Sequence, residues 1–96
     1  MAHYIAVIHK ERASAYGVSF PDVPGVIASA SSLDDAITQA AEALAFAAED
    51  WDSLTGEAFP APRTLDDLRN DPEFQALAGD AVIAAIPLQV SVGEAA

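Results

Sequence analysis

The chain of 96 residues contains no cysteine, which excludes disulfide bonds and thiolate metal sites. Basic residues are scarce as well: four lysines and arginines stand against fifteen aspartates and glutamates, and the formal net charge is -11. A chain with this charge repels phosphate backbones and attracts basic partners, so we expect no nucleic-acid binding through these residues. Aromatic residues make up only 7%, and much of the 52% hydrophobic content is alanine, which leaves few large side chains for one modest core.

Long hydrophobic runs are also missing. The longest, Ala81 to Ile86, is far shorter than a membrane span, and the amino terminus lacks the basic and apolar regions of a signal peptide. We therefore expect a single soluble, cytoplasmic domain that covers residues 1–96.

Residue patterns typical of catalysis are absent too. His3 and His9 lie six residues apart on an expected strand, which places their side chains about 20 Å apart on one face, too far to share a metal ion. Ser14, Ser19 and Ser29 do not lie in a G-x-S-x-G elbow, and no glycine-rich phosphate loop precedes a helix. The sequence predicts neither a catalytic residue nor a metal or cofactor site, and favours binding over catalysis.

The most informative feature that the chain does contain is a proline-rich corner, in the segment YGVSFPDVPG. Residues 16–20 alternate as a half-buried strand does. Pro21 and Pro24 then fix two φ angles and remove two hydrogen-bond donors, which ends the strand. Asp22 can accept a local backbone hydrogen bond, and Gly25 can adopt a φ that other residues take only at a cost. We expect a strand, a rigid corner and a second strand.

The remaining patterns predict an α+β fold: an antiparallel three- to four-stranded sheet covered on one face by a long helix, in the order β-β-β-α-β. The hydroxyls and carboxylates of residues 31–35 are typical of a helix start, and Gly56 of a helix end. Two short helices are expected to be small surface pieces, and Pro87 favours a sheet edge or a kink. The expected strands are Tyr4–His9, 16–20, Val26–Ala30 and Ala81–Val92, and the short helices are Leu65–Arg69 and Asp71–Leu77.

The long helix has two contrasting faces. Apolar residues at steps of three and four positions form the face expected to pack on the sheet: Leu33, Ile37, Ala40, Ala41, Leu44, Ala48 and Trp51. The opposite face carries Asp35, Thr38, Glu42, Phe46 and Glu49. Phe46 is the only large apolar residue on that face. Either a neighbouring loop or the carboxy-terminal segment covers it, or it is a contact anchor ringed by carboxylates for a basic protein.

The ordered set of strand, P-D-x-P-G corner, strand, acidic cap, alanine-rich helix and Pro-rich exit near Pro60 resembles the amino-terminal domain of HicB-type antitoxins, over roughly residues 3 to 70. The resemblance implies a partial RNase H fold and a partner: a small, basic, RNA-cleaving toxin of the HicA type. RNase H chemistry needs converging carboxylates for two cations. The first strand has no acidic residue, and Asp22, Asp34 and Asp35 have ordinary turn and cap roles, so we expect no nuclease.

This combination gives a specific hypothesis: the domain neutralises such a toxin by covering its active surface. The residues expected to face the partner are Asp35, Glu42, Phe46 and Glu49 on the helix, and Pro21, Asp22 and Pro24 at the corner. The resemblance also implies a carboxy-terminal DNA-binding segment. We expect this segment to be absent here because only four residues follow Val92. The resemblance further implies a homodimer or higher oligomer. The alternative is a small-molecule or regulatory module that uses the sheet face and the corner as a pocket on a degenerate RNase H-like fold.

Overall fold

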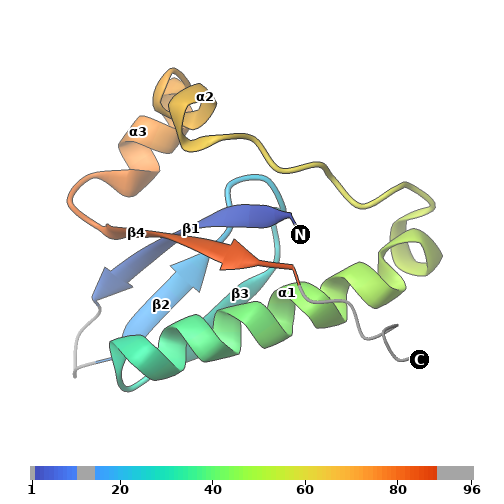
Figure 1. The fold of residues 1–96 in the computed structure, drawn as a ribbon, viewed down its shortest axis with the longest axis horizontal. Coiled ribbons are helices and arrows are strands. Elements are labelled where there is room, and N and C mark those ends of the chain that lie inside the picture. Colours follow the sequence, from blue (N-terminus) through green and yellow to red (C-terminus); the bar gives the residue numbers. More distant parts are fainter. Residues whose placement is uncertain (1, 11–14, 89–96) are drawn as a thin grey trace.

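The computed structural model describes residues 2–10 and 15–88 and contains one four-stranded antiparallel sheet in the order β3-β2-β1-β4. The long helix α1 lies across one face, and two short helices lie on the other side of the sheet (Figure 1). The predicted fold class is confirmed. The elements are β1 (His3–Lys10), β2 (Tyr16–Ser19), β3 (Ile27–Ala30), α1 (Leu33–Thr55), α2 (Leu65–Arg69), α3 (Pro72–Ala78) and β4 (Val82–Pro87).

Strand β1 is central because its residues are buried on both faces of the sheet. It pairs with β2 on one side, where Ile8 lies opposite Val18, and with β4 on the other, where Tyr4 lies opposite Ile86. Tyr4, Ala6 and Ile8 belong to the core under α1, whereas Val7 belongs to a second cluster on the opposite face. This explains why the strand is almost continuously apolar and shows little alternation.

Strand β4 lies at the edge of the sheet, as Pro87 predicted. Pro87 is its last residue, opposite His3, so the missing N–H interrupts no central ladder. The predicted strand extended to Val92, and its part from residue 89 onward lies outside the described residues.

Helix α1 begins and ends where the sequence predicted. The Ser32 hydroxyl accepts a hydrogen bond from the Asp35 backbone N–H at 3.1 Å, and Gly56 adopts a φ of 76° at the carboxyl end. The packed face is rotated slightly from the predicted one: Ala36, Ala40 and Leu44 are fully buried, while Ile37 is only half-buried. The small alanines allow the helix to lie close to β2 and β3, and the larger Ile37 lies at the margin of the contact.

The two short helices form a second layer, and the expectation that they are mere surface pieces is wrong. Leu68 of α2 is fully buried, and Phe74 of α3 is 4% exposed; both pack against Val7 of β1. The Thr64 hydroxyl accepts from the Asp67 backbone N–H, as the predicted capping pair requires, and Asp71 caps α3 in front of Pro72. The chain thus covers part of the second sheet face as well.

The extended connector between α1 and α2 carries aromatic packing back to the sheet. Phe59 contacts Trp51 edge-on, with ring centroids 5.3 Å apart, and lies 5.5 Å from the ring of Tyr4. Trp51 is half-buried and packs against the main core, which agrees with its predicted inward position. The connector is therefore attached to the body of the domain.

Candidate partner-binding surface

The proline corner consists of two consecutive β-turns that share Val23. The Val23 N–H donates to the Phe20 carbonyl, and the Val26 N–H donates to the Val23 carbonyl, both at 3.2 Å. Each turn has proline at its second position, and Gly25 follows Pro24 with a φ of 96°, which is typical of a type II turn. Val23 is fully buried, so the shared residue anchors the corner in the core while Pro24 and Gly25 remain exposed.

An ion-pair network holds this corner against the connector and α3. Asp22 accepts hydrogen bonds from the Arg63 backbone N–H at 2.7 Å and from Arg63 Nε at 2.6 Å, and Arg63 Nη1 donates to Asp71 at 3.0 Å. The Asp22 side chain is only 7% exposed. Direct contact of Asp22 with a partner stays a prediction, and the geometry favours a positioning role for this carboxylate.

The same network shifts proton affinities. The Arg63 guanidinium, together with the Glu73 backbone N–H, lowers the pKa of Asp71 below its ordinary value. The two carboxylates in turn raise the pKa of Arg63. Nearby, burial raises the pKa of the Tyr4 hydroxyl, with a smaller contribution from the charge of Asp22. Both shifts favour the charged forms of Arg63 and Asp71, which is the form in which the two side chains attract each other.

The four helical residues expected to face a partner are all exposed: Asp35, Glu42, Phe46 and Glu49. Phe46 is 70% exposed, an unusual position for a large apolar side chain on an otherwise acidic face. The neighbouring described loops leave it open. Whether the carboxy-terminal segment covers it, the other interpretation of the sequence, concerns residues outside the described part of the chain.

A cavity of about 300 Å³ lies between the corner and the last three turns of α1. Its walls include Pro24, Val26, Phe46, Asp50, Trp51 and Leu54. The structure thus brings together Pro24 and Phe46, which were predicted separately. Asp35 lies near the start of the helix, away from this cavity, and Pro21 lines a different hollow beside Arg63 and Phe74.

Sequence reasoning missed Asp50 and Leu54, although a signal was available. Both follow Phe46 at steps of four residues, so they continue the same line along the helix surface. Leu54 is 79% exposed, which makes it a second large apolar residue on this part of α1. Trp51 also lines the cavity, and its Nε1–H is buried without an acceptor among the described residues.

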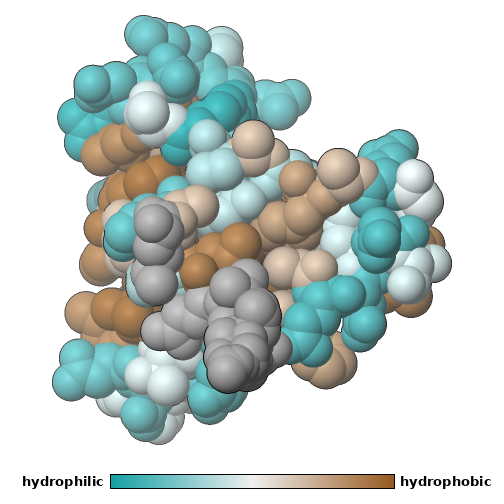
Figure 2. All heavy atoms as spheres, turned by 45° about the vertical axis from the view of Figure 1, so that its right-hand side comes forward, coloured by the Kyte–Doolittle hydropathy of each residue, from teal (hydrophilic) through white to brown (hydrophobic). Residues whose placement is uncertain are grey.

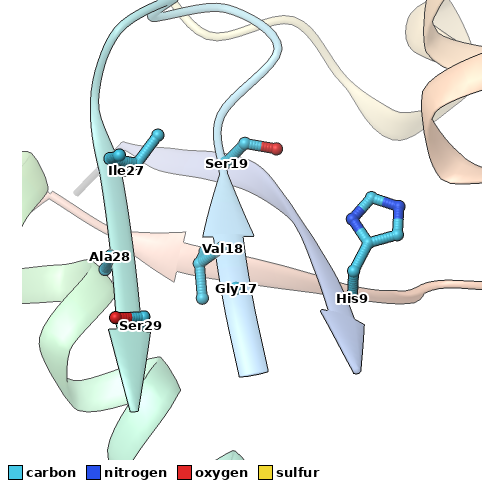
Figure 3. Close-up of a pocket in the computed structure, with 7 residues that line it drawn as sticks. All are labelled: His9, Gly17, Val18, Ser19, Ile27, Ala28 and Ser29. Carbon is cyan, nitrogen blue, oxygen red and sulfur yellow. The ribbon is translucent and has the colours of Figure 1, made fainter. Parts of the chain in front are cut away.

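A second, larger hollow of about 450 Å³ lies on the sheet face opposite α1, over β2 and β3. Figure 3 shows its lining residues, which come from β1, β2 and β3. Ser19 and Ser29 supply hydroxyls, and Ile27 is 71% exposed. His9 Nε2 donates to the Leu77 carbonyl at 2.9 Å, so this imidazole ties β1 to α3. The described residues that line this hollow include no carboxylate and no lysine, and the hollow would be the pocket of the alternative small-molecule module.

Among residues 2–10 and 15–88, no three histidine, cysteine, aspartate or glutamate side chains lie close enough to hold a metal ion. Asp22 is paired with Arg63, and Asp34 and Asp35 lie in the first turn of α1. The described helices also include none that is both long and apolar enough to cross a membrane.

Hydrophilic and hydrophobic regions are separated on the surface of the domain. In Figure 2, hydrophilic surface covers the upper part of the domain, which α2 and α3 form, and the lower part, while hydrophobic surface lies between them.

The fold and this surface define a small α+β domain with an acidic helical face and an apolar cavity beside a proline corner. Residues 4–94 match the family described as HicB_like antitoxin of bacterial toxin-antitoxin system. The chain belongs to this family. No curated protein sequence matches it significantly.

Solved structures agree with this assignment. The amino-terminal domain of the Burkholderia pseudomallei antitoxin HicB is 30% identical, with a TM-score of 0.73 over 92% of this chain and 99% of that one. A structure of Burkholderia pseudomallei HicB is 31% identical, with a TM-score of 0.76 over 95% of this chain and 66% of that chain. A HicA3 and HicB3 toxin-antitoxin complex contains the same fold at 18% identity, with a TM-score of 0.68 over 91% of this chain and 98% of that chain.

Proposed function

We propose that this domain is the toxin-binding part of an antitoxin, and that it neutralises a small basic HicA-type toxin by covering the surface with which that toxin cleaves mRNA. Membership of the HicB-like family supports the antitoxin role. The similar fold in a HicA3 and HicB3 complex supports the kind of partner. The observation that carries the proposal is Phe46, 70% exposed among the carboxylates of a domain with net charge -11.

The physical basis is competition for a cationic surface. A protein that binds RNA presents positive charge to phosphates, and an acidic protein face can occupy the same charges. Asp35, Glu42 and Glu49 would attract the toxin and speed the encounter, an effect that salt weakens.

Phe46 would supply the affinity that the charges do not. A phenylalanine buries about 200 Å² when fully covered, and covering its exposed 70% contributes roughly 3.5 kcal/mol at about 25 cal/mol per Å². Pro24 would extend this apolar contact, and Pro21 and Asp22 would fix its shape. The mechanism is blockade of another protein, without catalysis or a cofactor on this chain, and we place it in the cytoplasm, where mRNA is cleaved.

The experiment that tests the proposal is co-expression of this domain with a HicA-type toxin, scored by growth rescue and by co-purification. The double variant Glu42→Lys, Glu49→Lys should bind an inactive toxin variant at least about tenfold more weakly at low salt, with slower association. The variant Asp66→Lys, Asp80→Lys changes the net charge equally on the opposite layer and serves as the matched control. Equal losses of toxin affinity in both variants would mean that the effect depends on net charge alone and not on this face of the helix. Absence of growth rescue by the unchanged domain would refute the proposed function.

A further inference from the structure

The cavity between the corner and α1 has a composition that selects one kind of side chain. Phe46 and Leu54, 70% and 79% exposed, lie one helical turn to either side of Asp50. Pro24 and Trp51 complete the apolar walls. Among residues 2–10 and 15–88, Asp50 is the only charged residue that lines the cavity. A carboxylate set among aromatic and aliphatic groups is complementary to a long side chain with an apolar stem and a cationic end.

We propose that this cavity receives an arginine side chain of the toxin partner, with its stem against Phe46 and Trp51 and its guanidinium paired with Asp50. This inference rests on the proposed function and names the contact through which it operates. Arginine fits better than lysine because its planar guanidinium both stacks on aromatic rings and donates two parallel hydrogen bonds to one carboxylate.

Charge and size argue for this occupant over others. The domain carries a net charge of -11, and none of the described residues that line the cavity is a lysine or arginine, so these lining residues supply no cation for the Asp50 carboxylate. A volume of about 300 Å³ is at the small end of ligand pockets and suits one long side chain. A purely apolar anchor would leave Asp50 desolvated without a partner, which is unfavourable.

The test compares Asp50→Asn with Asp52→Asn. Both remove one carboxylate from the same exposed stretch of α1, but only Asp50 lines the cavity. Binding of each to an inactive toxin variant is measured by calorimetry, after thermal unfolding has shown that each variant is folded. We expect Asp50→Asn to weaken binding about tenfold or more, as for loss of a hydrogen-bonded charge pair, and Asp52→Asn less than about twofold. A double-mutant cycle with arginine-to-alanine variants of the toxin should locate one arginine whose effect disappears in Asp50→Asn.

Three results would overturn the inference. Equal effects of the two substitutions would show a diffuse charge effect. A large loss in Phe46→Ala with none in Asp50→Asn would mean that the cavity takes an apolar side chain. Dissociation of a dimer by Phe46→Ala, with toxin affinity unchanged, would mean that a second copy of the chain occupies it. In each case the unchanged domain still binds the toxin, whereas failure of the unchanged domain to bind would refute the proposed function itself.

Discussion

The second hydrophobic cluster predicts a large effect for a substitution that lies far from the proposed interface. Leu68 is fully buried against Val7 and Phe74, and the cluster has only partly buried residues around these three. A leucine-to-alanine change in a core costs about 2–5 kcal/mol, and less where the surroundings can collapse. Because α2 is a five-residue helix near the surface, we expect Leu68→Ala to cost about 2.5 kcal/mol.

The assay is thermal unfolding followed by circular dichroism. A domain of this length has an unfolding entropy of about 200 cal/mol/K, so the expected loss lowers Tm by about 12 °C. Leu54→Ala is the matched control, since Leu54 is 79% exposed and its truncation should cost under about 0.5 kcal/mol. If both variants lose the same few degrees, α2 and α3 contribute little to the folded state and the two-layer description is wrong.

Three further substitutions test local features. Gly25→Ala should lower stability by about 1–2 kcal/mol. The cause is the backbone φ of 96° and not a steric clash, because an added Cβ would meet no atom within 4 Å. Gly25→Asn should cost less, since asparagine tolerates a positive φ better than alanine does, and equal losses in the two variants would contradict this reason. Ser32→Ala should cost about 1 kcal/mol in urea unfolding, and Ser31→Ala almost nothing, unless Ser32 is not the effective cap. Asp71 has a lowered pKa, so its stabilising charge is present above about pH 4 and is lost on further acidification. The Tm difference between wild type and Asp71→Asn should therefore shrink below that pH. A Tm difference that stays constant with pH would exclude a charge effect.

The elements that the sequence predicted well are those governed by local rules. The Ser32 cap, the Gly56 end and the turn at Gly25 depend on a few neighbouring residues with defined backbone preferences. The outward position of Phe46 followed from helical periodicity alone. Periodicity was less accurate for the buried face, where it favoured Ile37 over Ala36 because size was weighed above close approach to the sheet.

The features that the sequence did not reveal depend on contacts between distant segments. The second layer rests on single residues such as Leu68 and Phe74 in helices too short to show a period. The pairing of Asp22 with Arg63 spans 41 positions. The cavity needs Pro24 beside Asp50, and no spacing rule connects a turn to the end of a helix that follows it.

These long-range contacts explain why the cavity can keep one shape. Its corner wall is attached at two points that do not line it: Val23 is buried in the core, and Asp22 is held by Arg63, which also binds Asp71 at the start of α3. The helical wall is held by Leu44 in the core and by the contact of Trp51 with Phe59. Because both walls are fixed before a partner arrives, little conformational entropy would be lost on binding, and the small apolar area at Phe46 and Leu54 can contribute most of its burial energy to affinity.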